Sequence, residues 1–197
     1  MREGTWKNAE LEMTKFDPLS METLSTILLE NTGPYNHLII CGQALSLRLF
    51  QLVDRFGSKF CKTFICDRCA FENSEGKGTH AQRLSAFCQD QSLFSNPLLE
   101  EKLVYVYPAS DLLYHVNREK NWLFRVFMDL TYSRYNFTQQ LGEFCNYLPA
   151  GTIICGNRAG DPYVKELLSH FSNQHPYAFI QITEGFWHFT VPTFGIQ

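Results

Sequence analysis

The residues best suited to chemistry are carboxylates that directly follow short apolar runs. Such runs resemble buried strands, and polar groups that follow the strands of a parallel sheet collect at one edge, where ligands bind. Asp67 ends the run that begins at Lys62, Asp111 follows the run closed by Pro108, and Glu184 follows YAFIQIT. We predict that Asp67, Asp111 and Glu184 act as general acid, general base or ligand for a substrate hydroxyl.

The turn GNRAGD, residues 156–161, is the richest single source of binding groups. Its two glycines would let the backbone approach a ligand closely, Arg158 could pair with a phosphate or carboxylate, and the following helix would present unpaired N–H groups. The alternative is an ordinary capped turn, because Asp161 would cap those N–H groups and repel an anion. We predict an anion-binding turn with these ligand-binding residues: Gly156, Asn157, Arg158, Gly160 and Asp161.

Two other strand exits add polar groups, and we predict Gly42, Gln43 and Ser110 as further ligand-binding residues. Asp67 lies 25 residues after Gly42, about where dinucleotide-binding folds keep an acid for the ribose hydroxyls. The glycine fingerprint that accompanies that acid is missing, since residues 42–46 read GQALS. The sequence therefore argues against NAD bound in the usual manner and leaves the cofactor unknown.

Four residues have the types that bind zinc: Cys66, Cys69, His80 and Cys88. The competing interpretation is that Cys66 lies in a strand and faces the core, where a free cysteine behaves as a small hydrophobe. A zinc knuckle also needs a tight turn between its cysteines, which a strand does not provide. We predict no metal site and keep zinc as the alternative, which metal analysis of the purified protein would decide.

Residues 37–56 and 62–71, HLIICGQALSLRLFQLVDRF and KTFICDRCAF, resemble the isochorismatase-like cysteine hydrolases. The shared features are a strand, a Gly-x-Ala turn, a helix and a further strand that ends in Asp. That family carries its cysteine nucleophile near the start of the helix, where this sequence has Leu47 and Arg48. The resemblance therefore implies a shared strand-turn-helix arrangement and does not imply the hydrolase activity.

Apolar runs of strand length alternate with segments of helical spacing along the chain. Continuous apolar strands between helices indicate a parallel sheet covered on both faces. We predict a Rossmann-like three-layer α/β sandwich with a mostly parallel sheet of about five strands and a possible antiparallel edge strand at 186–191. The five expected strands cover residues 37–42, 62–67, 102–107, 151–156 and 177–183.

Capping residues and three-to-four spacing of apolar residues locate the helices between those strands. We interpret 112–148 as two helices, with a restart at Asn136 or Thr138. The other expected helices begin at Asp17-Pro18, cover 45–56 and 80–88, open at Asn96-Pro97, and run from Asp161-Pro162 to Phe171. We expect one domain over 1–197, with residues 1–16 peripheral or poorly ordered.

The totals restrict the class of protein. The net charge of -3 comes from 17 basic and 20 acidic residues without a run of either sign, so we expect no nucleic-acid partner. No apolar stretch approaches the roughly 20 residues that span a bilayer, so we expect no membrane partner. Seven cysteines, several of them in apolar runs, do not suggest a disulfide framework, which favours a soluble, cytoplasmic protein.

Two functions stay open at this point. The first is a Rossmann-like enzyme that binds a nucleotide-like or other anionic small molecule at the carboxyl edge of the sheet, with its reaction unknown. The second is a non-catalytic module that senses a ligand or binds a protein, and a homodimer is possible. Its interface would use aromatic residues such as Tyr132, Tyr135, Trp187 and Phe194.

Overall fold

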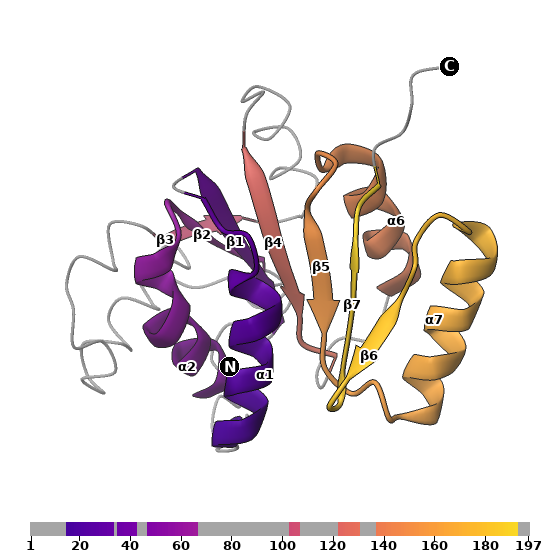
Figure 1. Cartoon of the computed structure of the whole chain (residues 1–197), viewed down its shortest axis with the longest axis horizontal. Helices are drawn as coiled ribbons and strands as arrows, with labels where there is room; N and C mark the ends of the chain where they lie inside the picture. Colours follow the sequence, from indigo (N-terminus) through magenta and orange to yellow (C-terminus); the bar gives the residue numbers. More distant parts are fainter. Residues whose placement is uncertain are drawn as a thin grey trace, which may run out of the picture.

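The computed structural model describes residues 15–33, 35–42, 47–66, 103–106, 122–130 and 137–192. These residues contribute one sheet of seven strands in the order β3-β2-β1-β4-β5-β7-β6 (Figure 1). The strands are β1 (Asn36–Cys41), β2 (Thr63–Cys66), β3 (Leu103–Val106), β4 (Leu123–Met128), β5 (Ile153–Gly156), β6 (Gln181–Thr183) and β7 (Phe186–Thr190). The helices are α1 (Pro18–Leu29), α2 (Leu47–Phe56), α6 (Phe137–Tyr147) and α7 (Pro162–Gln174), and the short 3-10 helix η2 (Gly57–Lys59) follows α2.

The sheet is parallel from β3 to β5, and β7 runs antiparallel to both of its neighbours. The reversal is made by a two-residue turn, Glu184-Gly185, in which both residues have positive φ angles of 46° and 86°. Hairpin turns of this kind match the twist of the strands they join. Because β6 and β7 are antiparallel to each other, β6 runs in the same direction as β1 to β5.

The order of the strands reverses between β1 and β4. The chain moves outward from β1 through β2 to β3 and then returns to β4 on the other side of β1. In open α/β sheets the crevice at such a switch point, beyond the carboxyl ends of the strands, is where ligands bind. In the view of Figure 1, β4 and β5 point downward, so that this edge of the sheet lies at the bottom of the molecule.

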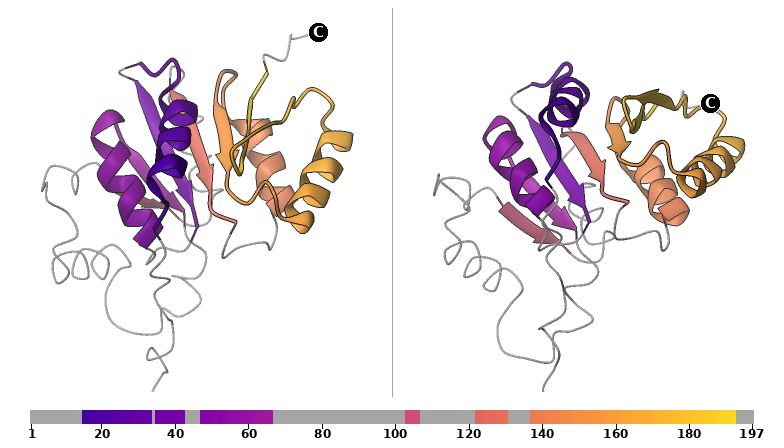
Figure 2. Two further views of the ribbon diagram at one scale, coloured as in Figure 1. Left: turned by 60° about the horizontal axis from the view of Figure 1, so that its bottom comes forward. Right: turned by 90° about the horizontal axis from the view of Figure 1, so that it is seen from below.

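Helices cover both faces of the sheet. Leu24, Leu28, Leu52 and Phe56 of α1 and α2 pack in one apolar cluster with Ile40 and other residues of the sheet. A second cluster joins the opposite face of the sheet to α6 and α7. Figure 2 shows the two helix pairs on opposite sides of the sheet. The predicted Rossmann-like three-layer sandwich with a mostly parallel sheet is confirmed.

The prediction of two helices in 112–148 is wrong, because Leu123–Met128 forms the central strand β4. Phe124, Val126 and Met128 belong to one apolar cluster, whereas Phe127 belongs to the other. A strand buried on both faces reads as a continuous apolar run, and periodicity alone does not separate such a run from a buried helix. The helix expected after a restart at Asn136 or Thr138 is present as α6.

The end of the chain also differs from the prediction. Of the expected strand 177–183, only Gln181–Thr183 is a strand, and it forms the edge of the sheet. The antiparallel strand β7 is present but lies between β5 and β6 instead of at the edge. Burial explains the difference: Phe186, Trp187 and Phe189 of β7 are buried, whereas all three residues of β6 are exposed. The expected helices at 80–88 and near 96 lie outside the described residues.

Arg125 fixes α1 to the amino edge of the sheet. Its side chain, in β4, is 2% exposed, and its guanidinium donates to the carbonyl oxygens of Glu30 (2.9 Å) and Phe124 (3.0 Å). Burial lowers the pKa of the Arg125 guanidinium. The carbonyl groups at the end of a helix carry partial negative charge, which compensates the buried cation. The other end of α1 is therefore held near the carboxyl edge.

Gly156, the last residue of β5, is required by packing. A Cβ atom at this position would collide with the indole ring of Trp187 and lie 2.8 Å from the carbonyl oxygen of Met128. The Trp187 ring is fully buried, and its Nε1 donates to the carbonyl oxygen of Asn157 at 3.1 Å. A side chain at 156 would therefore displace β7 or β4.

We expect Gly156→Ala to lower the free energy of unfolding by about 1–3 kcal/mol, as overpacking of a core does. The matched control is Gly160→Ala, because no heavy atom lies within 4 Å of a Cβ atom built there. The control is expected to stay within about 0.5 kcal/mol of the wild type. Urea denaturation of the two variants makes the comparison, and equal midpoints would contradict this account of the strand exit.

Candidate functional site

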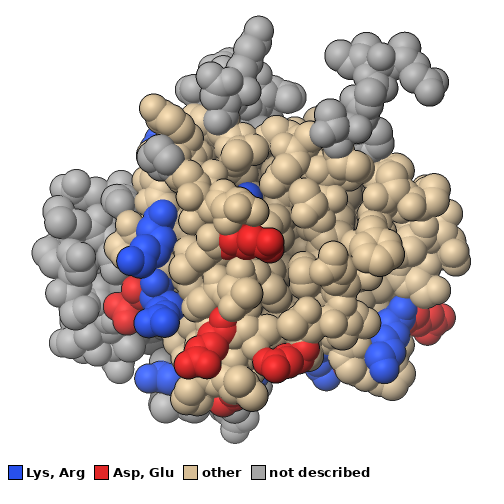
Figure 3. All heavy atoms as spheres, viewed as in Figure 1, with Lys and Arg blue, Asp and Glu red and all other residues tan. Residues whose placement is uncertain are grey.

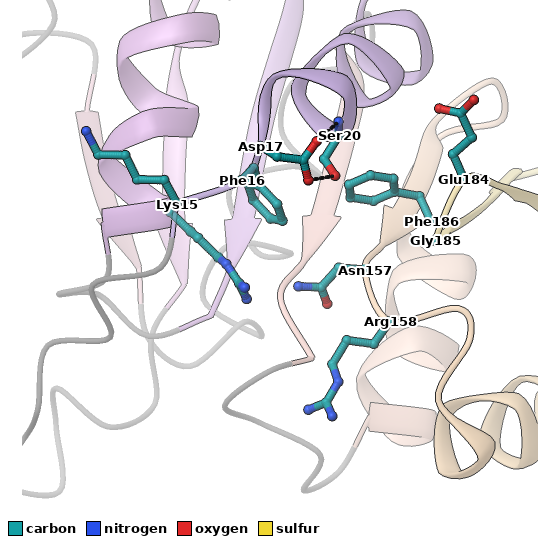
Figure 4. A pocket seen from close by; sticks show the side chains of 10 residues that line it. Lys15, Phe16, Asp17, Ser20, Asn157, Arg158, Glu184, Gly185 and Phe186 are labelled. Atoms are coloured by element: carbon teal, nitrogen blue, oxygen red, sulfur yellow. Dashed lines mark hydrogen bonds between the residues drawn. The ribbon is translucent and has the colours of Figure 1, made fainter.

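A pocket of about 480 Å³ opens at the carboxyl edge of the sheet (Figure 4). One wall comes from the segment that begins α1, a second from α2, and a third from the exits of β5 and β6. The residues that line the pocket are Lys15, Phe16, Asp17, Ser20, Arg48, Asn157, Arg158, Glu184, Gly185 and Phe186. Segments distant in sequence therefore meet at the edge where the sequence predicted a site.

The segment before α1 is held across the pocket by both backbone and ring contacts. Gln51 of α2 accepts a hydrogen bond from the Phe16 N–H (2.8 Å) and donates one to the Phe16 carbonyl oxygen (2.9 Å). The Phe16 ring lies 5.9 Å from the rings of both Phe127 and Phe186. Phe16 and Phe186 therefore form an aromatic wall of the pocket, and the buried Phe127 packs against Phe16.

Asp17 lines the pocket, but its carboxylate caps the N-terminus of α1. One oxygen accepts from the Ser20 N–H (2.9 Å) and the other from the Ser20 hydroxyl (2.7 Å), as an N-cap residue does. The hydrogen bond from the Ser20 backbone is the main cause that lowers the pKa of Asp17. Pro18 follows at the first position of the helix, so the start of α1 is well defined by sequence.

Arg48 enters the pocket from α2. Its guanidinium carbon lies 4.9 Å from the centre of the Phe16 ring, a cation–π contact. One guanidinium nitrogen is 3.9 Å from Oδ1 of Asp129, and the Arg48 side chain is 19% exposed. The cation is thus held between the aromatic wall and a buried carboxylate while it still faces the pocket.

Asp129, the residue after β4, links three strand exits. Its N–H donates to the carbonyl oxygen of Cys41 at the end of β1 (2.7 Å), and its Oδ1 accepts from Nδ2 of Asn157 (2.7 Å). Oδ1 of Asn157 in turn accepts from the N–H of Leu130 (2.8 Å). Both side chains are 5% exposed. The exits of β1, β4 and β5 are therefore fixed relative to one another.

Two residues of the pocket have unfavourable backbone conformations. Arg158 and Glu184 have φ angles of 61° and 46°, in a region that residues other than glycine rarely adopt. Such strain is often found at functional sites. The N–H of Ala159 donates to the carbonyl oxygen of Gly185 (2.9 Å), so the two strained turns support each other.

The charged groups of these turns are paired within the protein. Nη2 of Arg158 lies 2.8 Å from Oδ2 of Asp161, and Oδ1 of Asp161 accepts from the N–H of Tyr163 at the start of α7 (2.9 Å). The Glu184 carboxylate accepts a hydrogen bond from the hydroxyl of Thr23 on α1. The GNRAGD turn is therefore a capped turn as well as a wall of the pocket.

The structure brings together part of the predicted site. Asn157, Arg158 and Glu184 line the pocket. Gly42 does not line it, and a Cβ atom at Gly42 would be 3.0 Å from that of Asp129. Gly156 is required by the Trp187 ring and the Met128 carbonyl oxygen beside it, and no heavy atom lies within 4 Å of a Cβ atom built at Gly160. The predicted residues that lie outside the described part of the chain are Gln43, Asp67, Ser110 and Asp111.

The sequence also left open an aromatic protein interface and a zinc site. The aromatic interface is wrong for Trp187, whose side chain is fully buried, while Tyr132, Tyr135 and Phe194 lie outside the described residues. Among the residues described, no group of three or more His, Cys, Asp and Glu could hold a metal ion. Cys66 is buried in β2, and Cys69, His80 and Cys88 lie outside the description, so the zinc alternative stays untested.

Sequence reasoning missed Asp129, Arg48 and Phe16. A signal for Asp129 was present, because LFRVFMD has the same form as KTFICD, an apolar run that ends in Asp. The helical interpretation of 112–148 hid it. Arg48 and Phe16 gave no local signal, since only the folded chain brings α2 and the segment before α1 to the same pocket.

Acidic and basic side chains are interspersed on the face that Figure 3 shows, mostly over its lower half, near the carboxyl edge of the sheet. No described helix is both long and apolar enough to cross a membrane.

No protein-family model matches the sequence, and no curated protein is significantly similar to it. Solved structures share the fold. The apo structure of CalS11, a TDP-rhamnose 3'-O-methyltransferase of calicheamicin biosynthesis, has a TM-score of 0.59 and 14% identity, covering 87% of this chain and 77% of its own. An O-methyltransferase from Bacillus cereus in complex with SAH has a TM-score of 0.55 and 17% identity. The match covers 93% of this chain and 85% of that methyltransferase.

A third structure, cofactor-bound Rv0187 from MTB, has a TM-score of 0.55 and 14% identity and covers 95% of this chain and 86% of its own. At such low identity the likeness of all three shows the fold. This chain therefore shares a Rossmann-like α/β architecture with structures that include two O-methyltransferases.

We expect Asn157→Asp to destabilise the protein at neutral pH, because it places a second carboxylate where an amide now donates to Asp129 at 2.7 Å. Two carboxylates this close cannot both ionise without cost, so the loss of unfolding free energy is expected to be about 1–3 kcal/mol. Lowering the pH toward about 4, where carboxyl groups take up protons, should reduce the difference from wild type. Asn157→Ala is the control: it removes the amide donor but adds no second carboxylate, so its loss should recover less in acid than that of Asn157→Asp. Equal recovery of the two variants would contradict the contact.

Proposed function

We propose that the protein binds S-adenosylmethionine at the carboxyl ends of β1 and β2 and transfers its methyl group to a hydroxyl of a small molecule in the pocket. The fold is similar to that of two O-methyltransferases, one of them in complex with SAH. The observation that carries the proposal is the place of the pocket, at the carboxyl edge and lined by the exits of β5 and β6. Asp129 connects it to the exit of β1.

The residues at the first two strand exits suit an adenosyl cofactor. Gly42 leaves its backbone free of a side chain at the switch point, and Asp129 occupies the adjoining space. Asp67 directly follows β2 in the sequence, the position from which an acid reaches ribose hydroxyls in related architectures. In this proposal Gly42, Gln43 and Asp67 hold the cofactor, which supplies an electrophilic methyl group.

Methyl transfer to a hydroxyl requires a group that accepts the hydroxyl proton. A carboxylate can do this when it lies within hydrogen-bond reach of the substrate. Glu184 is the sequence-predicted carboxylate that lines the pocket, and its hydrogen bond from Thr23 holds it in place. We assign the role of general base to Glu184, whose carboxylate lies on the α1 side of the pocket, with Asn157 and Arg158 as polar contacts for the acceptor molecule on the opposite side.

The second candidate is a ligand-binding module that performs no reaction. It is favoured by the internal pairing of the charged groups, since Arg158 pairs with Asp161 and Glu184 accepts from Thr23. The turn after β1 also contains a single glycine. Such a module would bind the nucleoside and transfer nothing, so binding and transfer must be measured separately.

We expect the wild-type protein to bind SAH in isothermal titration calorimetry. Gly42→Ala should weaken this binding at least about tenfold, or 1.4 kcal/mol, because its Cβ atom presses on Asp129 at 3.0 Å and shifts the exit of β1. The matched control is Gly33→Ala, in a loop where no heavy atom lies within 4 Å of the added Cβ atom. Absence of SAH binding by the wild type would refute the cofactor assignment.

Transfer is tested with S-adenosylmethionine that carries an isotopically labelled methyl group and a panel of hydroxyl-bearing small molecules, read by mass spectrometry. Glu184→Gln is expected to lower turnover by about 100-fold or more while SAH affinity stays unchanged, as loss of a general base does. A protein that binds SAH but labels no acceptor would instead be the non-catalytic module.

A further inference from the structure

We propose that the pocket binds an aromatic acid, a small molecule in which a planar ring carries a carboxylate or a phosphate group. The acidic group pairs with Arg48, and the ring packs against Phe16 and Phe186. The role of this aromatic acid as the methyl acceptor rests on the proposed function. Binding of the acid in this pocket does not depend on methyl transfer and is inferred from the geometry of the pocket alone.

The charges that line the pocket favour an anion. Lys15, Arg48 and Arg158 contribute three cations, against the carboxylates of Asp17 and Glu184. Both carboxylates are engaged in holding α1, since Asp17 caps the helix and Glu184 accepts from Thr23. In Figure 4 the Glu184 carboxylate lies toward α1, away from Asn157 and Arg158. The wall formed by α2 and the exit of β5 is therefore cationic and amide-lined.

Among these cations, Arg48 is the best placed to bind the acid. Arg158 lies 2.8 Å from Asp161, a direct ion pair that competes with a ligand. Arg48 lines the pocket with its guanidinium over the Phe16 ring, next to the aromatic wall, and its side chain is 19% exposed. A guanidinium matches a carboxylate or phosphate with two parallel hydrogen bonds, and the Phe16 face limits its movement.

Asn157 separates the buried carboxylate of Asp129 from the ligand. Asn157 lines the pocket and Asp129 does not, and the Asn157 amide donates to Asp129 Oδ1 at 2.7 Å. The negative charge of Asp129 thus fixes Arg48 from behind without forming the wall of the pocket.

The aromatic wall suits a planar ring. Phe16 and Phe186 lie 5.9 Å apart with an angle of 53° between their rings, and Phe16 is further fixed edge-on against Phe127. Offset and tilted ring contacts of this kind contribute about 0.5–1.5 kcal/mol each beyond burial of area. The volume of about 480 Å³ lies within the range of about 300–1,000 Å³ typical of small-ligand pockets.

The test compares 4-hydroxybenzoate, phenyl phosphate and the neutral amide 4-hydroxybenzamide by isothermal titration calorimetry. At least one acid is expected to bind about tenfold more tightly than the amide, because only the acids make a charge-assisted pair with Arg48. Preference for 4-hydroxybenzoate identifies a carboxylic acid as the natural class, and preference for phenyl phosphate identifies a phosphate ester. Equal binding of all three, or no binding, would overturn the proposal.

Arg48→Gln should remove the preference for the acid. Arg55→Gln is the matched control, because Arg55 lies on the exposed side of the same helix and does not line the pocket. Equal effects of the two substitutions would overturn the role of Arg48. Circular dichroism checks the fold. If the glutamine variant unfolds, Arg48→Lys tests the same role, because lysine keeps the charge and loses the two parallel hydrogen bonds. The lysine variant is expected to lose at least part of the preference for the acid, and a preference equal to that of the wild type would overturn the role of Arg48.

A parallel titration with SAH separates this inference from the proposed function. Binding of SAH without binding of an aromatic acid refutes the substrate class and leaves the cofactor assignment standing. Binding of an aromatic acid without SAH supports the pocket and refutes methyl transfer.

Discussion

The hydrogen bond between Asn157 and Asp129 is the contact on which the carboxyl edge depends. It joins the exits of β4 and β5, and the backbone of Asp129 binds that of Cys41 at the exit of β1. Both side chains are buried, so the loss of this hydrogen bond would cost about 1–3 kcal/mol of unfolding free energy. The same pair sets the position of Arg48. This polar contact therefore supports both the fold and the candidate site.

Helix α1 gives this edge its second wall and is fixed at both ends. Arg125 binds its last turn at the amino edge, and Gln51 clamps the backbone of Phe16 ahead of its first turn. A helix held in this way can present Phe16 and Ser20 to a ligand without large movement. Binding then requires little ordering of the protein, which favours affinity.

Sequence patterns predicted the architecture because buried strands and capped helices leave local signals. KTFIC and IICG read as strands, and Asp17-Pro18 and Asp161-Pro162 marked the starts of α1 and α7. Strand β4 was missed because its two buried faces erase the alternation that marks a strand. Asp129 was lost with it.

The candidate site could be predicted only in part, for the same physical reason. Asn157, Arg158 and Glu184 follow recognisable strands, so their edge was predictable from topology. The pairing of Arg158 with Asp161 and the convergence of Arg48 and Phe16 depend on side-chain packing between distant segments. No local pattern encodes that packing.

The central claim is that ligands bind at the carboxyl edge of this sheet, beside Asp129. A crystal structure of the protein grown with SAH and 4-hydroxybenzoate tests it most directly. We expect the nucleoside to bind beside Gly42 and the acid to bind against Arg48. Ligands bound at the amino edge near Arg125, or on the outer surface of the helices, would contradict it.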